Sequence, residues 1–164
     1  MSMSEKEMFL QAWEREFQTT LKVLNAYPSD KLDLKPAEKS KSASDLACVF
    51  TGEQGIVDMV IKGKIDFSGP QPPAPKTMGE IITAYENAVK TNIQRVKAMS
   101  DADYNSMIGW FVAPKTPGNV RKADVLWMTL NDMIHHRGQL SVYLRIAGGK
   151  LPSIYGPTAD EPWM

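Results

Sequence analysis

The sequence has few of the features that would place it in a specialised class of protein. It contains a single cysteine, Cys48, so it forms no internal disulfide, and one thiol in 164 residues is typical of a protein from a reducing compartment. Its 19 basic residues balance 19 acidic residues, which leaves no excess positive charge for binding nucleic acid or an anionic membrane surface. We therefore expect neither nucleic acid nor a membrane as a partner.

Long hydrophobic runs are also absent. No stretch of about 18 apolar residues occurs, so we expect no transmembrane helix. The N-terminal segment carries charged residues from Glu5 onward, too early and too often for a signal peptide. These absences predict a cytoplasmic protein.

The sequence does have the length and apolar content of one folded domain. Hydrophobic residues make up 43% of the 164 residues, which is enough for one substantial core. No internal repeat, low-complexity tract or domain boundary interrupts the chain. We expect a single domain over residues 1–164.

Apolar residues recur at helical spacing in four long segments, and capping residues mark where three of them begin. The predicted helices cover residues from about 4–26, 42–62, 77–99 and 124–147. A Pro/Gly-rich connection over residues 63–77 is expected to cross an end of the bundle or to line a site. Residues 100–122 are irregular; a short strand is one alternative there, but we predict a loop. The proline-rich tail from Leu151 is expected to lie across the bundle surface.

The fourth helix is predicted to be central, because apolar residues cover two neighbouring stripes of its surface. The first stripe consists of Leu126, Leu130, Met133, Leu140 and Leu144. The second stripe includes polar side chains at Asp132, His136 and Gln139. A helix of this kind should pack on two sides, and its inward polar groups need partners.

Asp132 and His136 are four residues apart, so their side chains lie on one face of the helix. A carboxylate and an imidazole in this arrangement can bind one divalent metal ion, or they can hydrogen-bond to each other in a core without metal. A metal site needs a third ligand from another helix, and the sequence offers Cys48, Glu53 or Asp58. The spacing by itself leaves both alternatives open.

Several neighbouring polar residues are predicted to support such a site. Glu53 falls on the apolar stripe of the second helix and therefore needs a partner. Arg137 lies on the apolar stripe of the last helix, where it either pairs with an inward carboxylate such as Glu53 or extends its charged end to solvent. Gln139 is expected to hydrogen-bond to the ligands. His135 points about 100° away from His136, towards the surface or a dimer contact, and we assign it no catalytic role.

The last helix and its exit, HHRGQLSVYLRIAGGKLPSIYGP, resemble the closing part of the DinB superfamily of DNA-damage-inducible and YfiT-like metalloenzymes. The resemblance is strongest over residues 136–139 and 155–157. The stretch KSASDLACVFTGEQ, which contains Glu53, is similar to the second helix of that family. With the number of helices, the resemblance covers nearly the whole chain. It implies an all-α four-helix bundle with a long crossover connection, often dimeric.

The resemblance also implies a metal site. Members of the superfamily typically bind zinc or nickel through one histidine of the second helix and two histidines of the last helix. In this sequence His136 matches the final histidine, whereas Asp132 and Cys48 stand in place of the other two. The resemblance thus implies Cys48, Asp132 and His136 as ligands, with an open position for water or a thiol.

Two functions follow from these observations. The first is a metal-dependent enzyme, either a hydrolase or a thiol-dependent transferase, that acts on a small molecule. The alternative is a metal-free, catalytically inactive bundle that binds a small molecule or a protein partner during stress. Direct DNA binding is less favoured, because the charge is balanced. From the resemblance we also expect a homodimer.

Overall fold

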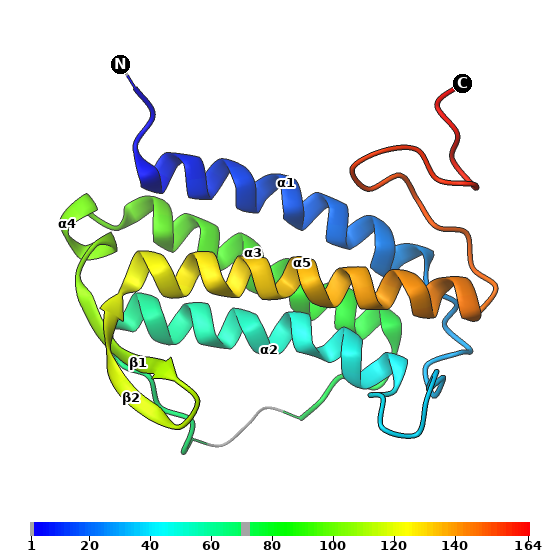
Figure 1. The fold of residues 1–164 in the computed structure, drawn as a ribbon, viewed down its shortest axis with the longest axis horizontal. Coiled ribbons are helices and arrows are strands. Elements are labelled where there is room, and N and C mark those ends of the chain that lie inside the picture. The colour runs from blue at the N-terminus through cyan, green and yellow to red at the C-terminus, as the bar shows by residue number, and fades with distance from the viewer. Residues whose placement is uncertain (1, 70–72) are drawn as a thin grey trace.

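The computed structural model describes residues 2–69 and 73–164, which form a bundle of four long helices with a small β-hairpin (Figure 1). The long helices are α1 (Glu5–Ala26), α2 (Ala43–Lys62), α3 (Met78–Ala98) and α5 (Lys122–Ile146). The one-turn helix α4 (Asp101–Tyr104) and the strands β1 (Met107–Ala113) and β2 (Thr116–Arg121) connect α3 to α5. The predicted four-helix bundle is confirmed.

The first three helices begin where a side chain satisfies the free N–H groups of the first turn. Their N-caps are Ser4, Ser42 and Thr77, and each forms a capping box with the residue three positions on. In the described structure α5 has no side-chain cap and begins directly after β2. The predicted bounds of the first three helices agree with the observed ones to within one residue.

The arrangement of the helices explains the long connections. Both α1 and α2 pack against α3 and α5, so α1 and α2 are diagonal to each other. Residues 27–42 therefore cross the bundle between them, and this is a long crossover of the kind that the family resemblance implies. Figure 1 shows α5 running between α1 and α2, and the predicted two-sided packing of α5 is confirmed. Its apolar stripe, Leu126, Leu130, Met133, Leu140 and Leu144, is buried.

The prediction of a loop over residues 100–122 is wrong, because most of this segment forms the α4 turn and an antiparallel hairpin. Ile108 of β1 is buried in the core, and Trp110 on the same face is half-buried. The strands are joined by a two-residue turn in which Lys115 adopts a positive φ of 59°. The hairpin covers the end of the bundle at which α5 begins (Figure 1).

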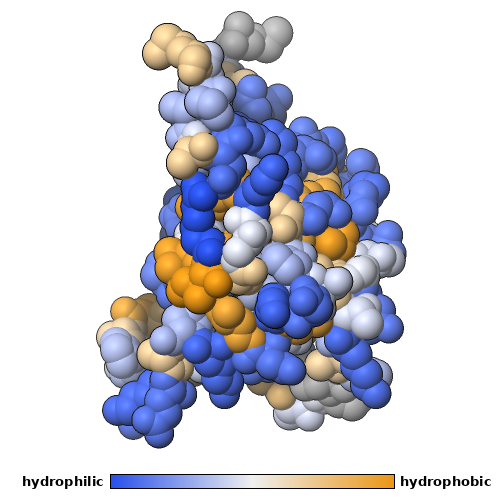
Figure 2. Space-filling view, turned by 90° about the vertical axis from the view of Figure 1, so that its right-hand side faces the viewer, coloured by the Kyte–Doolittle hydropathy of each residue, from blue (hydrophilic) through white to orange (hydrophobic). Residues whose placement is uncertain are grey.

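The other end of the molecule carries the crossover, the C-terminus of α5 and the tail. Figure 2 shows this end, where hydrophilic residues dominate and hydrophobic surface is limited to small patches. The connection predicted over residues 63–77 includes residues 70–72, which lie outside the described part of the chain. Among the described helices, none combines the length and hydropathy needed to cross a bilayer.

Candidate metal centre

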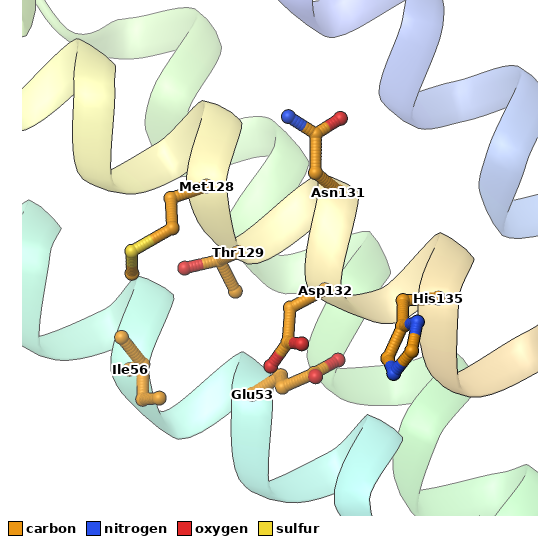
Figure 3. Close-up of a pocket in the computed structure, with 7 residues that line it drawn as sticks. All are labelled: Glu53, Ile56, Met128, Thr129, Asn131, Asp132 and His135. Atoms are coloured by element: carbon orange, nitrogen blue, oxygen red, sulfur yellow. The ribbon is translucent and has the colours of Figure 1, made fainter.

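Three potential metal ligands from two helices meet between α2 and α5. Glu53 of α2 and both Asp132 and His136 of α5 each offer one ligand atom, and these atoms lie within 4.8 Å of one another. Figure 3 shows the carboxylates of Glu53 and Asp132 turned towards each other across the two helices. Asp132 and His136 occupy successive turns of the same face of α5, as their spacing indicates.

Glu53 is the buried member of this cluster. Its exposed fraction is 4%, and neither carboxylate oxygen has a hydrogen-bond partner within the part of the chain that the structure describes. Burial, together with the negative charge of Asp132, raises the pKa of Glu53 to about 9. A buried carboxylate in this position needs either a proton or a cation to offset its desolvation.

His136 lies close to both carboxylates and is less exposed than Asp132. Its Nδ1 is 3.4 Å from Oε1 of Glu53 and 3.5 Å from Oδ1 of Asp132. The same nitrogen is 2.9 Å from the backbone carbonyl oxygen of Asp132. Nδ1 is thus the ring nitrogen that contacts the two carboxylates and this carbonyl.

A pocket of about 470 Å³ opens over the cluster. Its lining comprises Glu53, Ile56, Met128, Thr129, Asn131, Asp132 and His135. In Figure 3 Ile56 and Met128 lie on one side of the carboxylate pair, and the His135 ring lies on the other. The side chain of Asp132 is 54% exposed, so a ligand entering the pocket from solvent can reach the cluster.

Comparison with known proteins identifies the family. The model of the DinB family matches residues 1–163. This chain belongs to the DinB family. The uncharacterized protein YrdA of Bacillus subtilis (strain 168) is 27% identical to it over 156 residues, which cover 93% of this chain and 89% of YrdA.

Two solved DinB-like structures share the fold. A DinB-like protein from Bacillus cereus ATCC 10987 is 22% identical, with a TM-score of 0.75 over 90% of this chain and 95% of that protein. The DinB-like protein YjoA from Bacillus subtilis is 19% identical, with a TM-score of 0.74 over 90% of this chain and 97% of YjoA. At these identities the likeness establishes the fold, and the DinB-type bundle predicted from the sequence is confirmed.

Cys48 of this DinB-family chain lies apart from the cluster. Among the described residues, the group of candidate ligands does not include its thiol. The residue is half-buried, and five positions along α2 turn it about 140° away from Glu53. Burial, with the charge of Asp45, raises the pKa of the thiol, which disfavours the thiolate that binds metal. A ligand role for Cys48 stays a prediction, while Glu53 occupies the place beside Asp132 and His136.

Asp58, the other ligand considered from the sequence, is already engaged elsewhere. Its carboxylate forms ion pairs with Lys62, at 2.6 Å, and with Arg95 of α3. These contacts hold the pKa of Asp58 below its ordinary value against the opposing effect of burial. Asp58 therefore joins α2 to α3 and does not belong to the cluster at α5.

Arg137 pairs with a different carboxylate from the one predicted. It is 2% exposed, and its Nη2 lies 2.7 Å from Oε2 of Glu16 on α1. Nη1 also donates to the Glu16 carbonyl and to the hydroxyl of Thr20, at 3.2 and 3.3 Å. The prediction that Arg137 pairs with an inward carboxylate is confirmed, but Glu53 is not the partner. One step along α5 from His136 turns Arg137 away from α2 and towards α1. Glu16 was missed, although its position three residues after the buried Trp13 signals an inward side chain.

Gln139 contacts a neighbour of the cluster. Its Nε2 is 3.0 Å from Nε2 of His135, and both side chains are exposed. Gln139 and His136 also line a second hollow of about 490 Å³ on the far side of the cluster. A hydrogen bond from Gln139 to a ligand stays a prediction.

Proposed function

We propose that this DinB-family protein is a metal-dependent enzyme that binds one divalent cation through Glu53, Asp132 and His136 and acts on a small molecule. The observation that supports this most is Glu53, whose two carboxylate oxygens are buried without a hydrogen-bond partner in the described structure. They lie beside two further ligand groups within 4.8 Å. A cation there would offset both the desolvation of Glu53 and its repulsion from Asp132.

The donor set suits zinc, nickel and neighbouring divalent metals, since it combines one imidazole nitrogen with two carboxylates. Three protein ligands leave one position open to solvent. A bound ion of this kind would supply an activated water or thiol for attack on a small electrophile, the chemistry of a hydrolase or a thiol-dependent transferase. The pocket of about 470 Å³ has the size of a small-molecule site.

Metal analysis tests this proposal directly. The protein is stripped with a chelator, incubated with zinc or nickel, freed of excess metal, and analysed for ions per chain. We expect one ion per chain for the unmodified protein and loss of this ion in Glu53→Gln, Asp132→Ala and His136→Ala. Cys48→Ala is the matched control on α2 and should retain the metal.

Each contrary outcome has a distinct meaning. Loss of metal in Cys48→Ala with normal retention in Glu53→Gln would move the third ligand to Cys48, the set implied by the family resemblance. Absence of stoichiometric metal after incubation with both ions would contradict a metal-dependent enzyme.

The second candidate function is a metal-free bundle that binds a small molecule or a protein partner during stress. The observation that favours it is the pKa of Glu53, which is raised to about 9. At neutral pH a proton can therefore take the place of the cation beside Asp132. The same metal analysis separates the two functions, because this alternative predicts no retained ion.

We also propose that the protein is a cytoplasmic homodimer, the assembly implied by its family resemblance. Static light scattering at two protein concentrations measures the mass in solution. We expect twice the chain mass at both concentrations. A strictly monomeric mass would contradict the dimer without affecting the metal proposal.

A further inference from the structure

The pocket over the candidate metal centre has a neighbouring hollow on the other side of Met128. Met128 also lines the hairpin hollow, a cavity of about 230 Å³ between α5 and the β-hairpin. The hairpin hollow is bounded by Trp110 and Phe111 of β1 and by Val125 of α5. Positions 125, 128 and 132 lie on successive turns of α5. The two hollows therefore lie end to end along one face of the helix.

The wall of the hairpin hollow is apolar and open to solvent. Phe111 and Met128 are 56% and 43% exposed, and the Trp110 ring lies 6.3 Å from that of Phe111. Asp124 borders the same hollow, but its carboxylate is held 2.6 Å from Arg121. An apolar group placed here gains from burial and leaves that ion pair intact.

The face of α5 has a different character on the other side of His136. The hollow of about 490 Å³ at that end is bordered by Lys39, Lys41 and Gln139, which are exposed and polar. Leu46, Val142 and Tyr143 also line this hollow, so the two ends differ mainly in that lysines border the His136 end and no lysine or arginine lines the hairpin end. The His136 end is called the basic end. The two lysines favour an anionic or polar group there over an apolar arm.

We propose that the substrate of this centre carries an apolar, preferably aromatic, arm that lies over Met128 under the hairpin while its polar head reaches Glu53, Asp132 and His136. This inference rests on the proposed function and names the substrate class of the same site. Hollows of about 470 and 230 Å³ have the size of a small-molecule site. A second copy of the chain that covered Phe111 would leave the pocket beside Glu53 unfilled.

Two hydroxamate probes test the arm on the zinc-loaded protein by isothermal titration calorimetry. Acetohydroxamate supplies the metal-binding head alone, whereas naphthohydroxamate adds an aromatic arm. We expect naphthohydroxamate to bind at least about tenfold more tightly, because its ring is removed from water. Phe111→Ala should reduce this advantage to about threefold or less without changing zinc uptake or acetohydroxamate affinity, and Met128→Ala should also reduce the advantage. Val142→Ala, an exposed apolar residue at the basic end, is the matched control and should change neither affinity.

The outcomes separate this inference from the metal proposal. Equal affinities for the two probes in a protein that takes up zinc would overturn the apolar arm alone. Failure to take up zinc would overturn both proposals. Loss of the advantage in Val142→Ala but not in Met128→Ala would overturn the assignment of the arm to the hairpin end. A Phe111→Ala variant that changes the mass in light scattering but not the probe affinities would assign the apolar surface to a second copy of the chain.

Discussion

At position 53 of α2, burial and charge act in the same direction on one carboxyl group. Removal from water disfavours the ionised form of Glu53, and the nearby Asp132 carboxylate adds repulsion, so the pKa rises from an ordinary value of 4.5 to about 9. In the metal-free protein Glu53 therefore holds a proton at neutral pH that it loses in the unfolded chain. The stability of the metal-free protein must depend on pH for this reason.

The sign of this dependence follows from proton binding. Between about pH 4.5 and 9 the folded state binds more protons at Glu53 than the unfolded state does. The free energy of unfolding should therefore fall as pH rises through this range, by at most about 1.4 kcal/mol per pH unit for one proton. Glu53→Gln replaces the carboxyl group with an amide of the same shape that does not titrate. The free energy of unfolding of this variant should therefore lack the part of the fall with pH that comes from Glu53. Denaturant unfolding of both chelator-treated proteins across this range measures the difference, and parallel pH profiles would contradict the raised pKa.

Residue-level prediction succeeded where helix geometry alone decides the outcome. Asp132 and His136 lie together because four residues return a helix to the same face. Periodicity also marked Glu53 as an inward carboxylate, which burial confirms. The partner of Arg137 could not be found in this way, because periodicity gives the face of a helix and not the neighbouring helix that it meets. Only the packed bundle shows that Glu16 fills that role.

At the scale of elements, the helices were predictable because their signals are local. The capping boxes at Ser4, Ser42 and Thr77 each involve residues three positions apart, so they act before any tertiary contact forms. The hairpin was missed because a two-stranded ribbon is marginal without packing. Its stability depends on the burial of Ile108 in the core, which is a contact with distant parts of the chain.

Replacing two glycines, one inside the last helix and one just past its end, with alanine should change the free energy of unfolding in opposite directions. Gly148, just past the C-terminus of α5, has a φ of +80°, which strains an alanine, so Gly148→Ala should lower the free energy of unfolding by about 1–2 kcal/mol. Gly138 lies inside α5, and no described atom beyond its own helix backbone is within 4 Å of an added Cβ. Gly138→Ala should therefore raise the free energy of unfolding, by up to about 1 kcal/mol. Urea unfolding measures both variants, and a change of the same sign at the two positions would contradict this account of the helix end.

At the scale of the whole molecule, the C-terminal segment contacts both α1 and α5. The sequence led us to expect that this tail lies across the bundle surface. After α5 the chain turns back, and its end lies beyond α1 in Figure 1. The Tyr155 hydroxyl accepts a hydrogen bond from Arg137 at 2.5 Å and donates one to Glu16 at 2.6 Å. Burial by itself raises the pKa of Glu16, but these hydrogen bonds and the charge of Arg137 outweigh it and hold the pKa below its ordinary value. Arg145 and Asp160 form a second link between α5 and the tail, at 2.5 Å.

This network predicts a graded response to substitution. Arg137→Met would remove the buried cation from the Glu16 carboxylate, which is 4% exposed, and leave only the exposed Arg15 at 3.1 Å. It should lower the free energy of unfolding by about 3 kcal/mol. Tyr155→Phe removes one hydroxyl and should cost about 1 kcal/mol, with faster amide hydrogen exchange confined to residues 150–164. Glu16→Leu combined with Arg137→Met should recover much of the loss, because no buried charge then lacks a partner. Denaturant unfolding and hydrogen exchange measure these effects. A fall in the free energy of unfolding for Arg137→Met no larger than that for Tyr155→Phe would mean that α1 is held to α5 by apolar packing and not by the ion pair between Glu16 and Arg137. The tail would then cover a contact between α1 and α5 that is stable without the tail.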